Sequence, residues 1–151
     1  MKPTLAAFLI LVGTLAVYAQ PDLDVIGSWK LDASRSNFSS PRDATADVLI
    51  KFERSDGMLR ETIKAVNAAG ESTRTINYAF DGSETVNGEG EERVRTRVRR
   101  TADTIILEWI DEGGAYTRTL TLSTDRRTLS IKAHDTTAGR KTDDLIVLQR
   151  Q

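Results

Sequence analysis

One predicted strand carries the residues best suited to hold a ligand, because an arginine and a tyrosine share its apolar face. Between residues 115 and 124, the alternate positions on that face are Tyr116, Arg118, Leu120 and Leu122, opposite threonines at 117, 119 and 121. An inward guanidinium beside a tyrosine can bind the carboxylate of a fatty-acid-like ligand through charge-assisted hydrogen bonds. The alternative is an internal ion pair, in which Arg118 is satisfied by a glutamate such as Glu61.

The side chains that usually carry catalysis are scarce. The sequence has no cysteine, and its one histidine, His134, lies in a polar turn region beside Asp135, which favours an exposed surface residue over a catalytic base. Zinc ligands of the usual nitrogen and sulfur kind are missing, and neither a Gly-x-Ser-x-Gly motif nor a phosphate-binding loop occurs. We therefore expect no enzyme activity, no metal and no cofactor. A barrel hydrolase or isomerase would need carboxylate or tyrosine chemistry, for example at Glu61 or Tyr116.

Two clusters of charged residues are expected to face solvent. The glutamates Glu84, Glu89, Glu91 and Glu92 lie on a glycine-rich segment whose spacing does not match an EF-hand loop, so a solvated loop is favoured over a calcium site. Arginines at 93, 95, 97 and 99 share one face of a predicted strand, opposite valines at 94 and 98. Since the apolar face of such a strand points inward, the arginine row is expected to point outward.

Strands must position these residues, since no stretch keeps a helical period for more than two turns. Short alternating segments follow one another and are joined by turns that contain glycine or aspartate. The predicted strands span 25–32, 46–53, 58–66, 71–80, 93–101, 104–111, 115–124, 128–133 and 142–149, with a less regular piece at 83–92. This pattern predicts an all-β fold, an antiparallel up-and-down β-barrel of roughly 8 to 10 strands.

The first residues have the pattern of a cleavable secretory signal peptide. Lys2 precedes an apolar run at 5–15, and small residues precede a predicted cleavage point after Ala19. The run is short for a membrane span, which needs ~20 residues, so an uncleaved anchor is the less favoured alternative. We therefore assign residues 1–19 to a signal peptide and residues 20–151 to a single secreted or periplasmic domain, with no stable membrane anchor after cleavage.

The composition of the remaining chain limits its partners and its means of stabilisation. The leader's only charged residue is Lys2, so the other 132 residues carry 20 basic and 22 acidic side chains. This near balance argues against a nucleic-acid partner, which normally leaves a strongly basic surface. Without cysteine the domain must be stable without disulfides, and a closed barrel can achieve this because closure removes exposed strand edges.

The opening of the domain resembles a known family. Gly27-Ser28-Trp29-Lys30-Leu31-Asp32, followed by Arg35-Ser36-x-Phe38, is similar to the start of lipocalin-like secreted bacterial proteins, Gly-x-Trp-Lys-Leu-Asn with Lys-Ser-x-Phe. An aromatic-Asp-Gly turn at 78–82 and a Thr-Asp-x-Arg-Thr-Leu hairpin at 124–129 extend the resemblance over most of the domain. The resemblance implies a barrel closed at one end by Gly27 and Trp29, with Arg150 stacked on the tryptophan.

The leading hypothesis is an exported, non-enzymatic, lipocalin-like barrel that binds a small apolar or amphipathic molecule. Arg118 and Tyr116 are its predicted polar anchors, and its predicted lining consists of Ile50, Phe52, Ile76, Tyr78, Leu107 and Trp109. The alternative is a barrel filled by its own side chains, which would act as an envelope or protein-interaction module. The pattern indicates no particular oligomeric state.

Overall fold

Ten strands make up most of the part of the chain that the structure describes. The structure is a computed structural model that describes residues 24–40, 46–139 and 141–151, so the predicted signal peptide at 1–19 and its cleavage point lie outside it. The strands are β1 (Gly27–Leu31), β2 (Asp47–Ser55), β3 (Met58–Asn67), β4 (Gly70–Ala79), β5 (Thr85–Asn87), β6 (Val94–Arg100), β7 (Ile105–Asp111), β8 (Gly114–Leu122), β9 (Thr128–Asp135) and β10 (Thr142–Arg150). Short 3-10 turns lie in the connections at η1 (Ala33–Arg35), η3 (Gly90–Glu92) and η4 (Thr137–Gly139). Within these ranges, no helix has the length and apolar character needed to cross a membrane.

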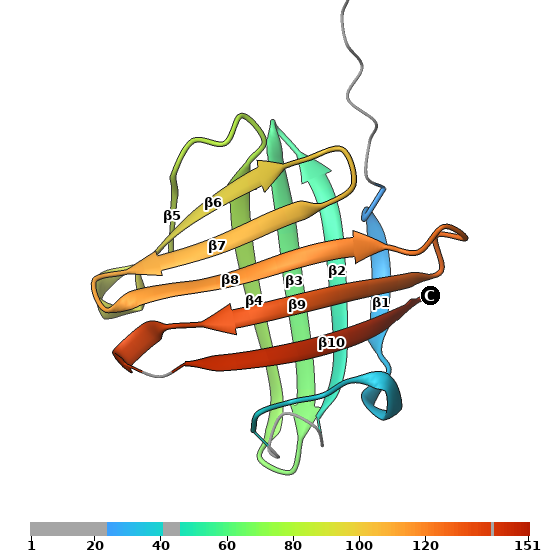
Figure 1. The fold of residues 1–151 in the computed structure, drawn as a ribbon. Helices are drawn as coiled ribbons and strands as arrows, with labels where there is room; N and C mark the ends of the chain where they lie inside the picture. Colours follow the sequence, from blue (N-terminus) through green and yellow to red (C-terminus); the bar gives the residue numbers. More distant parts are fainter. Residues whose placement is uncertain (1–23, 41–45, 140) are drawn as a thin grey trace, which may run out of the picture.

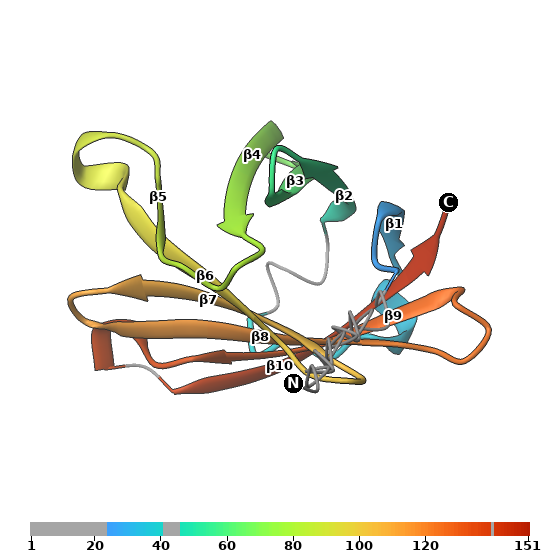
Figure 2. The same ribbon diagram turned by 90° about the horizontal axis from the view of Figure 1, so that it is seen from above.

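The strands form one antiparallel sheet that curls into an up-and-down barrel. Within the described residues, each strand pairs with the next along the chain except between β4 and β5, and β1 also pairs with β10. Seen from above, β1 to β4 lie over the row of strands from β10 to β6 (Figure 1; Figure 2). The predicted fold class is confirmed, with ten strands at the upper end of the expected range.

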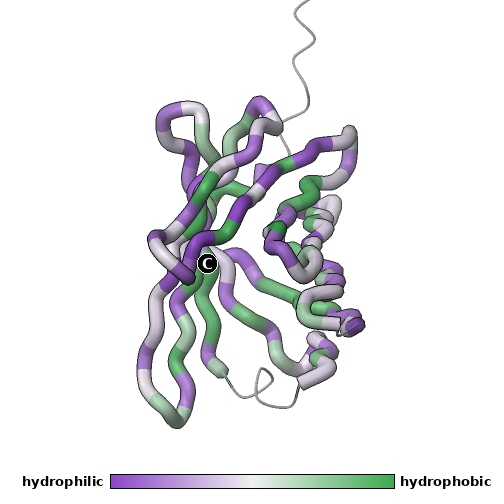
Figure 3. The backbone as a smooth tube through the Cα atoms, turned by 90° about the vertical axis from the view of Figure 1, so that its left-hand side faces the viewer, coloured by the Kyte–Doolittle hydropathy of each residue, from purple (hydrophilic) through white to green (hydrophobic). Residues whose placement is uncertain are grey.

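The two faces of each strand follow the predicted alternation, which appears as alternating colours along the tube in Figure 3. On β2, Ile50 and Phe52 are buried whereas Lys51 between them is exposed. The predicted strand at 128–133 is longer in the structure, because β9 continues to Asp135 and pairs there with both β8 and β10. The irregular segment at 83–92 contributes the three-residue strand β5.

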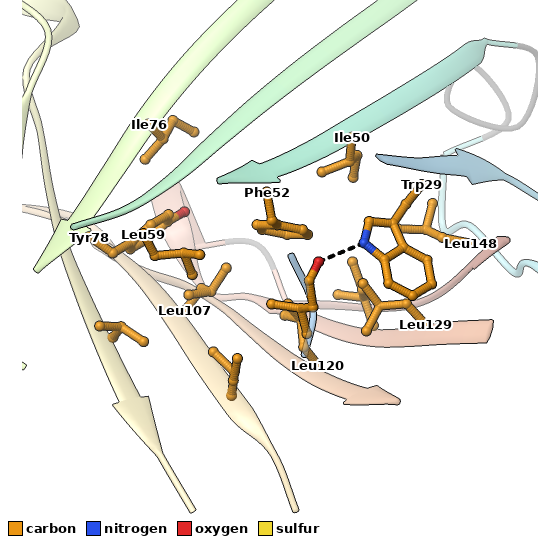
Figure 4. Packing of buried hydrophobic residues seen from close by; sticks show 14 residues of the cluster. Trp29, Ile50, Phe52, Leu59, Ile76, Tyr78, Leu107, Leu120, Leu129 and Leu148 are labelled. Atoms are coloured by element: carbon orange, nitrogen blue, oxygen red, sulfur yellow. Dashed lines mark hydrogen bonds between the residues drawn. The ribbon is translucent and has the colours of Figure 1, made fainter. Parts of the chain in front are cut away.

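Apolar side chains pack together in one half of the barrel interior (Figure 4). The buried members of this cluster are Val25, Trp29, Ile50, Phe52, Leu59, Ile76, Tyr78, Val98, Ile105, Leu107, Leu120, Leu129, Ile131 and Leu148. They come from every strand except β5 and from the residues just before β1. Because burial of apolar surface stabilises a fold by about 25 cal/mol per Å², this filled half supplies the main stabilising term.

The indole of Trp29 closes the filled half at the start of the domain. Trp29 is fully buried, and its Nε1 donates to the Val25 carbonyl over 2.7 Å, the dashed line in Figure 4. The guanidinium carbon of Arg150 lies 4.4 Å from the centroid of the indole ring, and Arg150 also donates to two backbone carbonyls just before β1 at 3.1 and 2.8 Å. Gly27 has a φ of +132°, and a Cβ there would lie only 3.2 Å from Arg150 Nη1. These contacts bring Gly27, Trp29 and Arg150 together at this end.

Side chains, rather than a strand ladder, close the barrel between β4 and the β5–β6 hairpin. The Asn87 amide oxygen accepts from the Asn77 backbone N–H at 2.7 Å, and its amide nitrogen donates to the Asn77 carbonyl at 3.0 Å. The same nitrogen donates to Thr96 Oγ1 at 2.9 Å, and Thr96 Oγ1 donates to the Asn77 carbonyl at 2.7 Å. Asn77, Asn87 and Thr96 form the seam of the barrel. The Asn87 amide satisfies the edge of β4 as a neighbouring strand would.

Arg95, Arg97 and Arg99 of the predicted arginine row point outward, as predicted, whereas Arg93, just before β6, lines the interior cavity described below. Arg95 and Arg97 lie 3.6 and 3.7 Å from Glu84, and Arg99 lies 2.5 Å from Glu108. These three arginines therefore belong to the outer surface, where ion pairs contribute little to stability because water screens them.

Candidate functional site

The other half of the barrel interior holds a cavity. Its volume is about 1220 Å³, and residues from all ten strands described above line it together with Phe38 from the β1–β2 connection. Phe38 is held there because its neighbour Asn37 pairs through its backbone with Leu145 of β10, at 2.7 and 2.9 Å. Ligand pockets in proteins usually measure about 300–1,000 Å³, so the cavity is large enough for a small molecule.

The cavity has an apolar side and a polar side. Strands β1, β2, β3 and β10 supply most of the apolar side, whose large side chains are Leu31, Val48, Ile50, Ile63 and Ile146. Strands β4 to β9 supply most of the polar side, and the η3 turn and β10 add further charged residues. The polar side presents Thr73, Arg74, Asn87, Glu91, Glu92, Arg93, Trp109, Asp111, Tyr116, Arg118, Asp135 and Asp144. This division suits a molecule that has both an apolar and a polar part.

A buried ion pair lies at the boundary between the cavity and the filled half. Arg118 Nη1 donates to Glu61 Oε1 at 2.7 Å, and Arg118 Nη2 donates to Glu61 Oε2 at 2.5 Å. The Tyr78 hydroxyl donates to Glu61 Oε2 at 3.0 Å and accepts from Arg118 Nη2 at 2.7 Å. Arg118 is 3% exposed and Glu61 is 0% exposed. Glu61, Tyr78 and Arg118 form the floor network, so the arrangement found for Arg118 is the internal ion pair with Glu61.

Two aromatic residues connect the floor network to the cavity. Trp109 Nε1 donates to the Tyr78 hydroxyl, and the Arg118 guanidinium carbon lies 4.9 Å from the Trp109 ring centroid. The ring centroids of Trp109 and Tyr116 are 5.3 Å apart, with the planes tilted by 58°. Because a guanidinium group is attracted to an aromatic face, this pair helps to hold Arg118 in the orientation that meets Glu61.

Burial controls the ionisation of the groups at this boundary. Burial raises the pKa of Tyr78 and of Tyr116 above the ordinary tyrosine value of about 10, so both hydroxyls are neutral at neutral pH. For Arg118, burial opposes the charge, but the Glu61 carboxylate outweighs that effect and the pKa is raised. Arg118 therefore stays a cation, and Glu61 is its counter-charge.

Three of the five predicted ligand-binding residues line the cavity, namely Trp109, Tyr116 and Arg118. Phe52 and Tyr78 do not line it. Both are fully buried, Phe52 within the filled half and Tyr78 within the floor network, and Leu107 is likewise part of the packed cluster. The alternation along the strands predicted the inward direction of these residues but not which half of the barrel each would occupy.

Arg74 lines the cavity although it was not among the predicted site residues. It shares the inward face of β4 with Ile76 and Tyr78, because the three residues occupy alternate positions on the strand. Its guanidinium carbon lies 4.6 Å from the centroid of the Trp109 ring. The alternation that predicts an inward direction for Ile76 and Tyr78 also predicts it for Arg74, two positions before Ile76 on the same strand.

Of the residues considered for catalysis or metal binding, Tyr116, Glu91 and Glu92 line the cavity, whereas Glu61, His134 and Glu84 have partners elsewhere. Glu61 is buried and bound to Arg118, and His134 pairs with Asp143 through Nδ1 at 2.7 Å, away from the cavity lining. Glu84, from the glutamate cluster, pairs with outward arginines. Across residues 24–40, 46–139 and 141–151, no group of three or more histidine, aspartate or glutamate side chains is placed to hold a metal ion.

Comparison with known proteins finds similarity of fold only. No protein-family model matches the chain, and no curated protein sequence matches it. The Schistosoma mansoni fatty acid binding protein in complex with arachidonic acid matches with a TM-score of 0.57 and 13% identity, over 83% of this chain and 95% of that one. Fatty-acid-binding protein 1 of Echinococcus granulosus matches with a TM-score of 0.58 and 8% identity, over 83% and 96% of the two chains. Zebrafish ileal bile acid-binding protein complexed with cholic acid matches with a TM-score of 0.54 and 11% identity, over 83% and 98%.

These matches show the architecture of a fatty-acid-binding-protein-like, nearly closed β-barrel. They span 83% of the chain. At such low sequence identity the similarity applies to the fold, because one fold can carry many unrelated functions.

Proposed function

We propose that this chain is a non-enzymatic β-barrel that binds a small apolar or amphipathic molecule in its cavity. The observation that carries the proposal is the cavity of about 1220 Å³, with its apolar side and its polar side. A barrel filled throughout by its own side chains, the alternative considered from the sequence, describes only the half that contains Trp29.

The structural neighbours support this proposal by analogy of fold. One is named as a complex with arachidonic acid and another as a complex with cholic acid. Both of these ligands are amphipathic acids. A cavity with an apolar side and a polar side in the same kind of barrel suits the same general class of molecule.

Within the proposed site we give Arg118 the role of the internal ion pair with Glu61, the alternative that the sequence left open. Both of its Nη groups are bound to Glu61, so it has no bidentate face left for a ligand carboxylate. Arg118 instead supports the boundary of the cavity and holds the neighbouring ring of Trp109. Tyr116 and Trp109 remain the proposed ligand contacts from the original prediction.

We also propose that the chain is exported and belongs to the lipocalin-like secreted bacterial proteins. The support is the signal-peptide pattern at 1–19 together with the Gly27-x-Trp29 motif. The stacking of Arg150 on Trp29 agrees with what that resemblance implies. Mass spectrometry of the mature protein from its host would test the expected cleavage after Ala19, and an intact leader would contradict it.

Quenching of tryptophan fluorescence by a brominated fatty acid tests binding at this place. The chain has two tryptophans, of which Trp109 lines the cavity and Trp29 is buried in the filled half. We expect dibromostearic acid to quench part of the emission of the unmodified protein. The Trp109→Phe variant should lose this quenching, because its remaining emitter is Trp29.

Two results would contradict the proposed function. The first is quenching that persists unchanged in Trp109→Phe, which would place the brominated lipid elsewhere on the protein. The second is an absence of quenching together with native mass spectra that show only free protein after purification from the host.

A further inference from the structure

Arg74 is a cation within the cavity. In the β3–β4 ladder it lies opposite Ile63, two positions beyond the Glu61–Ile76 pair toward the β3–β4 hairpin. Ile76 is buried whereas Arg74 is exposed and lines the cavity. Arg74 is therefore the next inward residue of β4 after the level of the floor network, on the open side of that network.

Among the described residues, no carboxylate forms an ion pair with Arg74. Its contact there is with the face of the Trp109 ring, at 4.6 Å. The outward arginines of β6 pair with Glu84 and Glu108, and Arg118, which also lines the cavity, pairs with Glu61. A third lining arginine, Arg93, lies just before β6. A guanidinium that lies over a ring keeps the N–H donors at its edge free for an anion.

The aspartates that line the cavity are held by nearby backbone and hydroxyl groups. Asp111 accepts from the Gly113 N–H at 2.7 Å, and Asp144 accepts from the Ser39 N–H at 2.6 Å. Asp135 accepts from the Thr137 N–H at 2.8 Å and from the Thr137 hydroxyl at 2.6 Å. Asp111 and Asp135 thus cap the turns that follow them, whereas Asp144 accepts from the β1–β2 connection. Two glutamates of η3, Glu91 and Glu92, also line the cavity, and neither forms an ion pair with Arg74 among the described residues. The charge of Arg74 is therefore available to an anion.

We propose that Arg74 binds the carboxylate of an anionic amphiphile held in the cavity. This inference rests on the proposed function and moves the charged anchor of the ligand from Arg118 to Arg74. Tyr116, which contacts the same indole as Arg74, is placed to add a hydroxyl donor to the head group. The apolar part of the ligand lies against the opposite side of the cavity, formed by residues such as Val48 and Ile63.

The test uses cis-parinaric acid, a fluorescent fatty acid, and its uncharged methyl ester. In titrations at low ionic strength and a pH at which the acid is ionised, Arg74→Met should weaken binding of the acid by about 10-fold or more. Arg74→Lys should retain part of the affinity, and the ester should bind the unmodified protein and Arg74→Met alike. Arg97→Met, which removes an outward arginine of β6, is the matched control and should leave binding of the acid unchanged.

The outcomes separate this inference from the proposed function. Equal affinity of the acid for the unmodified protein and Arg74→Met would overturn the role of Arg74 and leave ligand binding in place. An equal loss of acid and ester in Arg74→Met would also overturn it, because the residue would then only shape the cavity. Failure of both probes to bind the unmodified protein would overturn the inference and the proposed function for this ligand class. The unmodified protein alone gives one more test: if it binds the acid and the ester with nearly equal affinity, the inference is contradicted as well.

Discussion

Arg118 needs a partner wherever it is buried, because removing a charged side chain from water costs several kcal/mol. Glu61 provides that partner with two parallel hydrogen bonds, and Tyr78 adds a third contact. Arg118 Nε has no hydrogen-bond partner within the described residues. The floor network therefore gives Arg118 a structural role as the partner of Glu61.

Breaking the Glu61–Arg118 pair from one side should destabilise the fold strongly. Glu61→Gln leaves the Arg118 charge buried without its counter-charge, and we expect the free energy of unfolding to fall by about 3–5 kcal/mol. Chemical denaturation of the purified variant measures this change.

The double variant Glu61→Leu/Arg118→Met is the matched comparison. It removes both charges and keeps side chains of similar size, so it should recover most of the stability lost in Glu61→Gln, since replacing a buried ion pair by apolar residues is often neutral or stabilising. A Glu61→Gln variant as stable as the unmodified protein would contradict the assignment of a tightly coupled buried pair.

At the scale of the elements, the weakest connection in the barrel is the seam between β4 and β5–β6. Strand β5 has only three residues and pairs with β6, so no ladder within the described chain joins it to β4. The Asn87 amide takes the place of that ladder through hydrogen bonds to Asn77 and Thr96. The closure of the barrel thus depends on a few side-chain contacts at this point.

Asn87→Ala should weaken this closure. The substitution leaves the backbone groups of Asn77 without their amide partner, and we expect a loss of about 1–3 kcal/mol in the free energy of unfolding. Hydrogen exchange should be faster at the Asn77 amide than in the unmodified protein. Thr121→Ala, on the outer face of β8, is the control and should change neither quantity. Unchanged exchange at Asn77 in Asn87→Ala would show that the seam does not depend on the amide.

At the scale of the whole molecule, the two halves of the barrel interior have different tasks. The filled half, with Trp29 and its cluster, provides the apolar burial that a domain without disulfides needs. The other half contains the cavity and therefore buries less apolar surface. The ion pair of the floor network lies where the two halves meet.

Aspartates in the turns around the barrel make the stability of the fold depend on pH in the acidic range. A hydrogen bond from the Ser123 hydroxyl, at 2.6 Å, is the main cause that lowers the pKa of Asp125, and serine hydroxyls lower the pKa of Asp32 and Asp81 in the same way. A carboxyl whose pKa is lowered on folding stabilises the protein above the unfolded value of about 3.9 and loses this effect as the pH falls below it.

The free energy of unfolding should therefore decrease as the pH is lowered from about 5 to about 3. Asp125→Asn removes one of the titrating groups, so its stability should fall less steeply over the same range. Denaturant unfolding at a series of pH values measures both slopes. An equal or steeper fall in Asp125→Asn would show that the Ser123 hydrogen bond does not stabilise the ionised form.

Much of the fold could be predicted because strand side chains alternate with a period of two. The pattern of Val94, Thr96 and Val98 against the arginine row predicted that the row points outward, which the structure confirms except at Arg93, a cavity-lining residue. The same reasoning placed Tyr116, Trp109 and Arg118 inside the barrel. The strand boundaries were less certain, since they depend on the length of each ladder and thus on the neighbouring strands.

The sequence by itself determined that this chain forms a barrel of antiparallel strands and which side chains face its interior. Only the tertiary structure decided where along the barrel each inward residue lies, and so separated Phe52 and Tyr78 from the cavity that Trp109 and Tyr116 line. It also decided the partner of Arg118, because Glu61 is 57 residues away along the chain and reaches it only when β3 and β8 face each other across the closed barrel. Alternation is a local property of each strand, whereas these contacts depend on how distant strands pair and curl.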